Sequence, residues 1–154
     1  MNRFGLLFLS VLTLLSASCG QPPQLNVVDA VVKLSPVDTA PSALYFTVKG
    51  GERAVDLLRV SSPSVIRIEM HESVTDPKTG MLTMQPLERV TVPAKGKVAF
   101  KRGGKHVMLF GVNRVARNVE KLEMIFIFAD GSQIEVTAPI EKMSAAGGSE
   151  HKGH

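Results

Sequence analysis

Short runs of apolar and β-branched residues alternate with clusters of Pro, Gly, Ser and Asp from Leu25 onward, at intervals of about ten residues. β-Branched side chains fit the pleated, half-buried surface of a sheet, so such runs predict strands. The chain contains no convincing long helical period. The sequence therefore predicts an all-β sandwich or barrel, with strands at residues 25–34, 42–48, 54–60, 65–71, 82–87, 97–101, 106–110, 122–129 and 133–138.

The last two predicted strands flank the dipeptide Asp130-Gly131. Its second residue, glycine, tolerates positive φ, so we expect a tight antiparallel hairpin there. Other turns are expected at Gly50-Gly51, residues 77–80, residues 93–96 and Gly103-Gly104.

The first residues have the pattern of an export signal. Arg3 precedes an apolar run at residues 4–15, which is shorter than the ~20 residues of a membrane-spanning helix. Small residues then lead into Cys19, as in a bacterial lipobox, so residues 1–18 are predicted to be a lipoprotein signal peptide. Lipidated Cys19 would start a tether at residues 19–24. The alternatives are ordinary cleavage with export and a buried core cysteine.

This signal places the mature chain at the periplasmic face of the cell envelope, attached to a membrane through its lipid alone. Gly20 follows the cysteine where inner-membrane lipoproteins carry Asp, which favours the outer membrane. The folded domain is expected at residues 25–140. Residues 141–154 are poor in apolar side chains and are predicted to be a flexible tail.

Composition narrows the possible functions. The chain has 154 residues, 44% of them hydrophobic, which suits one compact domain. Its 18 Lys and Arg against 14 Asp and Glu give a net charge of +4, and Trp is absent. No basic face with interleaved aromatic residues is visible, so we expect no nucleic-acid partner. A single cysteine excludes a disulfide scaffold and a cysteine-ligated zinc site.

The candidates for chemistry are histidines and methionines. No serine lies in a nucleophile motif, and no reactive thiol remains after lipidation, so the set of candidate catalytic residues is small and acyl transfer is not expected. In His106-Val107-Met108 the first and third side chains share one face of a strand, and Val107 points to the core. That face would present an imidazole and a thioether together.

Residues 65–72 form a strand with two different faces. One face carries Ile66, Ile68 and Met70, and the other carries Arg67, Glu69 and His71. His71 therefore leaves the core side near the strand end, where a ligand could reach it; an ordinary exposed histidine is the alternative. Met70 and Met124, in contrast, are expected to fill the core.

The histidines and methionines together resemble a family motif. Twelve residues separate His71 from Met84, twenty-one separate Met84 from His106, and Met108 follows. This resembles the H-x10-M-x21-H-x-M pattern of the periplasmic copper chaperone family written PCu(A)C. The first spacing is two residues longer here, with residues 77–80 at the expected hairpin tip. Met81 lies ten places after His71 and competes with Met84, but residues 84–86 match the family text better. Further resemblance lies at residues 43–48, 61–63, 71–72, 85–88 and 104–109.

The resemblance implies a cupredoxin-like β-sandwich or barrel with Greek-key character. It implies one Cu(I) ion held by His71, Met84, His106 and Met108, with Met81 as an auxiliary ligand. Thioethers are soft and neutral, so such a set favours Cu(I) over the harder divalent ions. A blue-copper electron carrier is excluded because its site needs a cysteine thiolate. His151 and His154, with Met143 upstream, would form a second, flexible site for Cu(II), or belong to a solvated tail.

The family also implies a function, that of a copper carrier. A carrier makes no bond in a substrate, so we expect a protein that is not an enzyme. The protein would capture periplasmic Cu(I) and deliver it by ligand exchange to the copper centre of cytochrome c oxidase, directly or through a thiol-containing copper chaperone. Two alternatives stay open. One is copper storage or tolerance without a dedicated acceptor, and the other is a lipoprotein that binds a protein or polymer without using a metal.

Overall fold

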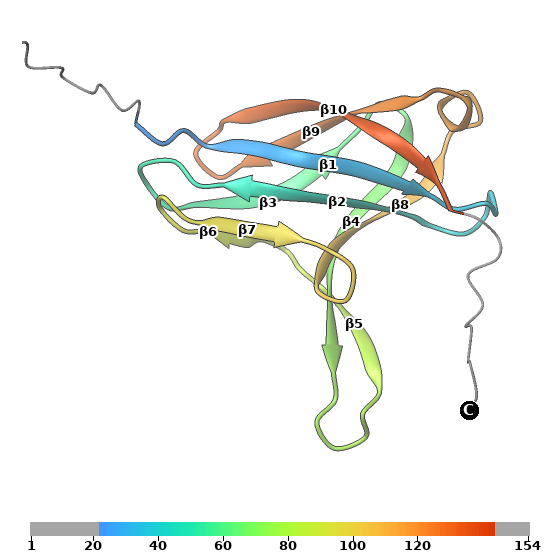
Figure 1. Ribbon diagram of the computed structural model, residues 1–154, viewed down its shortest axis with the longest axis horizontal. Helices are drawn as coiled ribbons and strands as arrows, with labels where there is room; N and C mark the ends of the chain where they lie inside the picture. The colour runs from blue at the N-terminus through green and yellow to red at the C-terminus, as the bar shows by residue number, and fades with distance from the viewer. Residues whose placement is uncertain (1–21, 144–154) are drawn as a thin grey trace, which may run out of the picture.

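The computed structural model describes residues 22–143. They form an all-β structure with one short 3-10 turn, as expected from the sequence (Figure 1). Within the described residues, no helix is long and apolar enough to cross a membrane. The elements are β1 (Asn26–Leu34), β2 (Ser42–Lys49), β3 (Val55–Ser61), β4 (Val65–Thr75), β5 (Leu82–Pro86), β6 (Val90–Val92), β7 (Lys97–Phe100), β8 (Lys105–Val112), η1 (Ala116–Asn118), β9 (Lys121–Phe128) and β10 (Gln133–Lys142).

The strands form two sheets that meet at one edge. The first has the order β5-β4-β8-β2-β1, with β7 also paired to β2. The second has the order β10-β9-β3-β6. β1 runs parallel to β10 from Val32, opposite Ile140, to Leu34, opposite Lys142, and this pairing joins the sheets. All other pairings are antiparallel.

The core lies between the two sheets. Side chains in β2 and β9 alternate between buried and more accessible positions, as strands with one covered face must. Phe46 on β2 stacks on Phe100 of β7 with a centroid distance of 4.2 Å, and it meets Phe126 of β9 edge-on at 4.7 Å. Each such aromatic pair adds about 1 kcal/mol beyond area burial. Met70 and Met124 lie in this core, as predicted.

The β9–β10 hairpin confirms the expected tight turn. Gln133 pairs with Ile127, Gly131 has φ +85°, and its N–H donates to the carbonyl of Phe128 at 3.1 Å. The β4–β5 hairpin behaves differently. It projects away from the sandwich (Figure 1), and every residue of β5 is exposed. The element that carries Met84 is therefore supported mainly by its partner strand β4.

Three features differ from the sequence prediction. The short strand β6 was not expected, and β4 and β10 continue past residues 71 and 138 to Thr75 and Lys142. Ile66 was expected on the core face but is 87% exposed. The Ile66 side chain lies over Gly111, and a Cβ atom added at Gly111 would be 2.8 Å from the Ile66 Cδ1 atom. Because Gly111 has no side chain, it cannot cover Ile66.

Candidate metal centre

The predicted metal ligands occupy one outward face of the first sheet. His71 on β4 lies directly opposite His106 on β8 and opposite Pro86 on β5. Met84 lies opposite Ser73, two residues along β4 from His71. Met108 follows His106 by two residues on β8. Side chains two apart in a strand share a face, so three neighbouring strands direct two imidazoles and two thioethers to the same side.

His106 is buried and has a fixed hydrogen-bond partner. His106 is only 7% exposed, and its Nδ1 atom lies 2.9 Å from the carbonyl oxygen of Gly104. A carbonyl can only accept a hydrogen bond, so Nδ1 of a neutral ring must carry the proton. Nε2 then keeps a free lone pair, which is the form of histidine that binds a metal. Val107, between the predicted ligands His106 and Met108, is fully buried in the core, as predicted.

His71 is oriented by a carboxylate. Its Nε2 atom lies 3.0 Å from Oε2 of Glu69, and its side chain is 14% exposed, less accessible than the sequence suggested. The ionised carboxylate accepts the Nε2 proton, which leaves the lone pair on Nδ1. That Nδ1 atom is buried and has no hydrogen-bond partner among the described residues. Buried polar atoms are nearly always partnered, so this nitrogen is suited to a ligand.

Glu69 is itself held on both sides. The hydrogen bond from His71, followed by the charge and hydrogen bond of Arg67, keeps the pKa of Glu69 below its ordinary value. The Arg67 guanidinium bonds to Glu69 and lies 4.0 Å above the Phe110 ring. The chain of contacts from Phe110 to Arg67 to Glu69 therefore fixes the His71 ring on the exposed side of β4. Only the shared face of these residues could be predicted from the sequence, not their contacts.

The two imidazole rings are close enough to share an ion. Their centroids are 6.1 Å apart, with an angle of 34° between the planes. When two imidazoles bind one metal ion through nitrogen–metal bonds of about 2.0 Å, their ring centroids can be roughly 6 Å apart.

A cavity of about 310 Å³ brings most of the predicted ligands together. Met84, His106 and Met108 line it, along with Tyr45. His71 lies beside this cavity, not in its wall. Met84 is 55% exposed because it projects from the β4–β5 hairpin. The site is therefore open on the side of this hairpin and closed on the side of β8.

Met143 also lines this cavity, although the sequence placed it in the tail. β10 continues to Lys142, and the N–H of Met143 donates to the carbonyl of Leu34 at 3.0 Å. Residues 141 and 142, which were also expected in the tail, belong to this strand. The sequence contains only a weak signal that Met143 belongs to the site. A single methionine beyond the last apolar run does not indicate which strand lies beside it.

The other candidate residues lie elsewhere. Met81 is 65% exposed near the hairpin tip and does not line the cavity. Cys19, His151 and His154 lie outside the described residues, so their predicted roles as lipidation site and tail ligands stay predictions.

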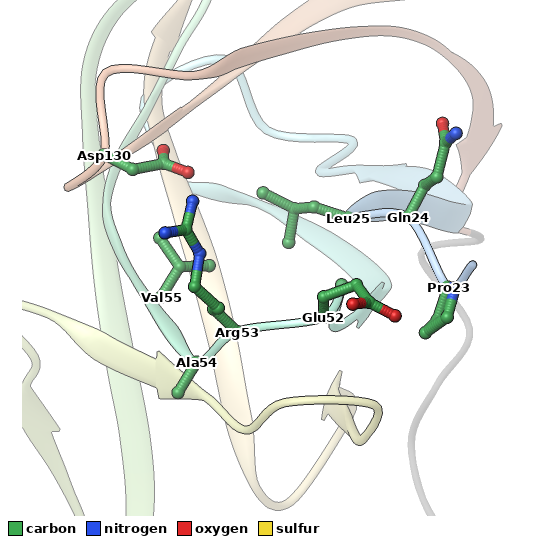
Figure 2. Close-up of a pocket in the computed structure, with 9 residues that line it drawn as sticks. Pro23, Gln24, Leu25, Glu52, Arg53, Ala54, Val55 and Asp130 are labelled. Atoms are coloured by element: carbon green, nitrogen blue, oxygen red, sulfur yellow. The ribbon is translucent and has the colours of Figure 1, made fainter.

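A larger cavity, of about 620 Å³, lies at the other end of β1 (Figure 2). It is lined by Leu25 and by Arg53, whose guanidinium points toward Asp130. Hydrogen bonds from Ser132, with a contribution from the charge of Arg53, lower the pKa of Asp130. None of the histidines or methionines of the predicted site lines this cavity, so its size does not make it the metal centre.

Solved structures with the same fold include PCuAC domains. The copper-bound PCuAC domain from PmoF2 matches with a TM-score of 0.62 and 17% identity, covering 80% of this chain and 97% of that one. The solution structure of apo-DR1885 from Deinococcus radiodurans matches with a TM-score of 0.56 and 23% identity, covering 93% and 95%. The Cu(I) form of DR1885 gives 0.57 and 24%, covering 80% and 83%. At these identities the likeness shows the fold, and it confirms the expected cupredoxin-like architecture.

A family model gives the closer assignment. The model described as "Putative lipoprotein LpqE-like" matches residues 25–140. The chain therefore belongs to the LpqE-like family. No curated protein sequence matches it.

Proposed function

We propose that this protein is a Cu(I)-binding metallochaperone whose site is formed by His71, Met84, His106 and Met108. The observation that carries the proposal is the arrangement of unprotonated imidazole nitrogens and thioethers on one sheet face. Hydrogen bonds to Glu69 and Gly104 leave one lone pair free on each ring. Two methionines from separate strands lie at the same cavity.

The donor set favours Cu(I) over other envelope metals. Thioethers are neutral, polarizable ligands that bind Cu(I) well and bind harder divalent ions weakly. Four neutral ligands leave the positive charge of the ion uncompensated, so the ion stays exchangeable. A carrier needs this property and makes no bond in a substrate, so the proposal is not for an enzyme. Two similar structures, a copper-bound PCuAC domain and the Cu(I) form of DR1885, support copper as the cargo.

Delivery would use the open side of the site. Met84 is half exposed on a projecting hairpin, so an acceptor's ligand can approach the ion beside it. As acceptor we propose the copper centre of cytochrome c oxidase, reached directly or through a thiol-containing copper chaperone. A thiolate binds Cu(I) more strongly than a thioether, which gives transfer a direction.

The first experiment is an anaerobic Cu(I) titration of residues 20–154 against a colorimetric Cu(I) chelator. We expect one tight equivalent, lost in His106→Ala and weakened at least about tenfold in Met84→Leu. Met81→Leu is the matched control, because Met81 is an exposed methionine of the same hairpin outside the cavity. Equal binding by parent, Met84→Leu and His106→Ala would reject the proposed site.

Storage or tolerance without a dedicated acceptor is the second candidate function. It uses the same site, so the titration cannot distinguish it from delivery. Transfer from the loaded protein to an apo copper-centre fragment of cytochrome c oxidase, or to a thiol-containing chaperone, separates the two. A chaperone loses its copper to such an acceptor much faster than to buffer, and a storage protein does not. If no copper binds at all, an interaction lipoprotein becomes the favoured function.

The proposed cellular location is the periplasmic face of the envelope, through a lipid on Cys19. The family description as lipoproteins supports the anchor. Mass spectrometry of the mature protein tests it: we expect a diacylglycerol-modified N-terminal residue at position 19. An unmodified N-terminus would mean export without an anchor.

A further inference from the structure

Met143 is held beside the proposed copper site by its backbone. The N–H of Met143 donates to Leu34, and the residue before it, Lys142, lies opposite Leu34 in the parallel β1–β10 pair. An ion pair between Lys33 and Glu141 supports the same pairing. The last residue of the described chain is therefore attached to the sheet edge.

Met143 follows β10, whereas the other two methionines at the cavity, Met84 and Met108, lie on β5 and β8. It lines the same cavity as Met84, His106 and Met108 and is 41% exposed. Methionines that serve packing in this protein, such as Met124, are fully buried. A half-exposed thioether at the wall of a cavity that already holds two others is placed to bind a soft metal ion.

We propose that Met143 is a third thioether ligand that exchanges with Met84 at the bound ion and takes its place while copper leaves the site. This inference rests on the proposed function and names a further ligand of the same site. Met84 lies on the projecting hairpin and Met143 at the end of β10, so the two approach the cavity from separate elements. When an acceptor displaces Met84, the ion is still held by His71, His106, Met108 and Met143.

Methionine methyl NMR tests the ligand directly. Residues 20–154 are labelled with ¹³C at the methionine methyl groups and titrated anaerobically with Cu(I). The methyl signals of Met84, Met108 and Met143 are expected to shift together at one equivalent, while those of Met81 and Met124 stay in place. Shifts of Met84 and Met108 without Met143 would overturn the inference and keep the proposed function. If one equivalent binds and none of these three methyl groups moves, both fail.

A double-mutant cycle gives a second readout. Met143→Leu alone is expected to weaken Cu(I) binding about twofold, because Met84 still completes the site. Combined with Met84→Leu, it should weaken binding at least about tenfold beyond Met84→Leu alone, since no replacement thioether remains. Met81→Leu combined with Met84→Leu is the control and should match Met84→Leu. If the Met143 and Met84 double variant also matches Met84→Leu, Met143 is not a ligand.

Discussion

Glu69 sets the chemical state of a proposed ligand without contacting the metal. Its carboxylate accepts the Nε2 proton of His71 and so keeps the Nδ1 lone pair free. Glu72, three residues further along β4, contacts Lys105 instead, at 2.6 Å. The two glutamates of one strand therefore provide a test and its control.

We expect Glu69→Gln to weaken Cu(I) binding between about tenfold and a hundredfold, the usual cost of removing a carboxylate behind a metal-binding histidine. The amide can turn either its oxygen or its nitrogen to His71, so both ring tautomers become accessible. Cu(I) competition titration measures the affinity, and ¹⁵N NMR of the apo protein reports the tautomer. Glu72→Gln should leave both unchanged. A Glu69→Gln protein with parental affinity would show that the carboxylate does not control the ligand.

The mixture of imidazole and thioether ligands predicts a specific dependence on pH. Protons compete with the metal for imidazole nitrogens, whereas thioethers do not protonate in this range. Copper affinity should therefore fall below about pH 6 without being abolished, because the methionines continue to bind. The pKa of Glu69 is lowered, chiefly by its hydrogen bond to His71, so its carboxylate protonates at lower pH than an ordinary glutamate does. Competition titrations between pH 8 and pH 4 measure the effect, and a constant affinity would remove both histidines from the site.

At the scale of elements, the β4–β5 hairpin places Met84, and Asp76 organises its tip. The Oδ1 atom of Asp76 accepts hydrogen bonds from the N–H groups of Lys78 at 2.7 Å and Thr79 at 3.1 Å. These backbone donors lower the pKa of Asp76. The carboxylate therefore stabilises the turn fully at any pH above the ordinary pKa of aspartate, and this stabilisation is lost as the pH falls through the lowered pKa.

Asp76→Ala removes the two side-chain hydrogen bonds of this turn. It should make the amides of Thr83 and Gln85, which flank Met84 and lie opposite Val74 and Glu72, exchange with solvent several-fold faster. Copper affinity should fall by less than in Met84→Leu, because the thioether is still present but less well positioned. Asp76→Asn keeps an acceptor oxygen and serves as the control, with exchange close to the parent. Hydrogen-exchange NMR makes the measurement, and unchanged exchange in Asp76→Ala would mean that the strand pairing alone holds Met84.

The elements also show which parts of the structure the sequence could predict. Strand periodicity and the Asp130-Gly131 turn correctly predicted most strands, and the spacing of His106 and Met108 predicted their shared face. β6 was missed because three residues are too short to establish a period. The neighbouring positions of Leu34 and Met143 arise from a parallel pair between the first and last strands, and local sequence carries no information about such long-range pairing.

At the scale of the whole molecule, the start of β1 and the proposed site lie at opposite ends of the sandwich. β1 begins at Asn26, opposite Lys49, and ends at Leu34, beside Met143. Eight residue steps of a strand span about 26 Å. The start of β1 therefore lies far from its end (Figure 1), where Met143 lines the copper cavity.

This geometry predicts that anchoring leaves the copper site accessible. If Cys19 is lipidated, the membrane lies beside the start of β1 and the cavity opens toward the aqueous phase. Protein anchored to phosphatidylcholine vesicles should therefore release Cu(I) to a soluble chelator at a rate within about twofold of that of residues 20–154 in solution. The reason is that the chelator reaches the cavity equally well in both cases, and the vesicle surface adds no charge there. Stopped-flow absorbance of the chelator complex measures both rates. A much slower release from vesicles would show that the site faces the membrane, and delivery would then require an acceptor at the membrane surface.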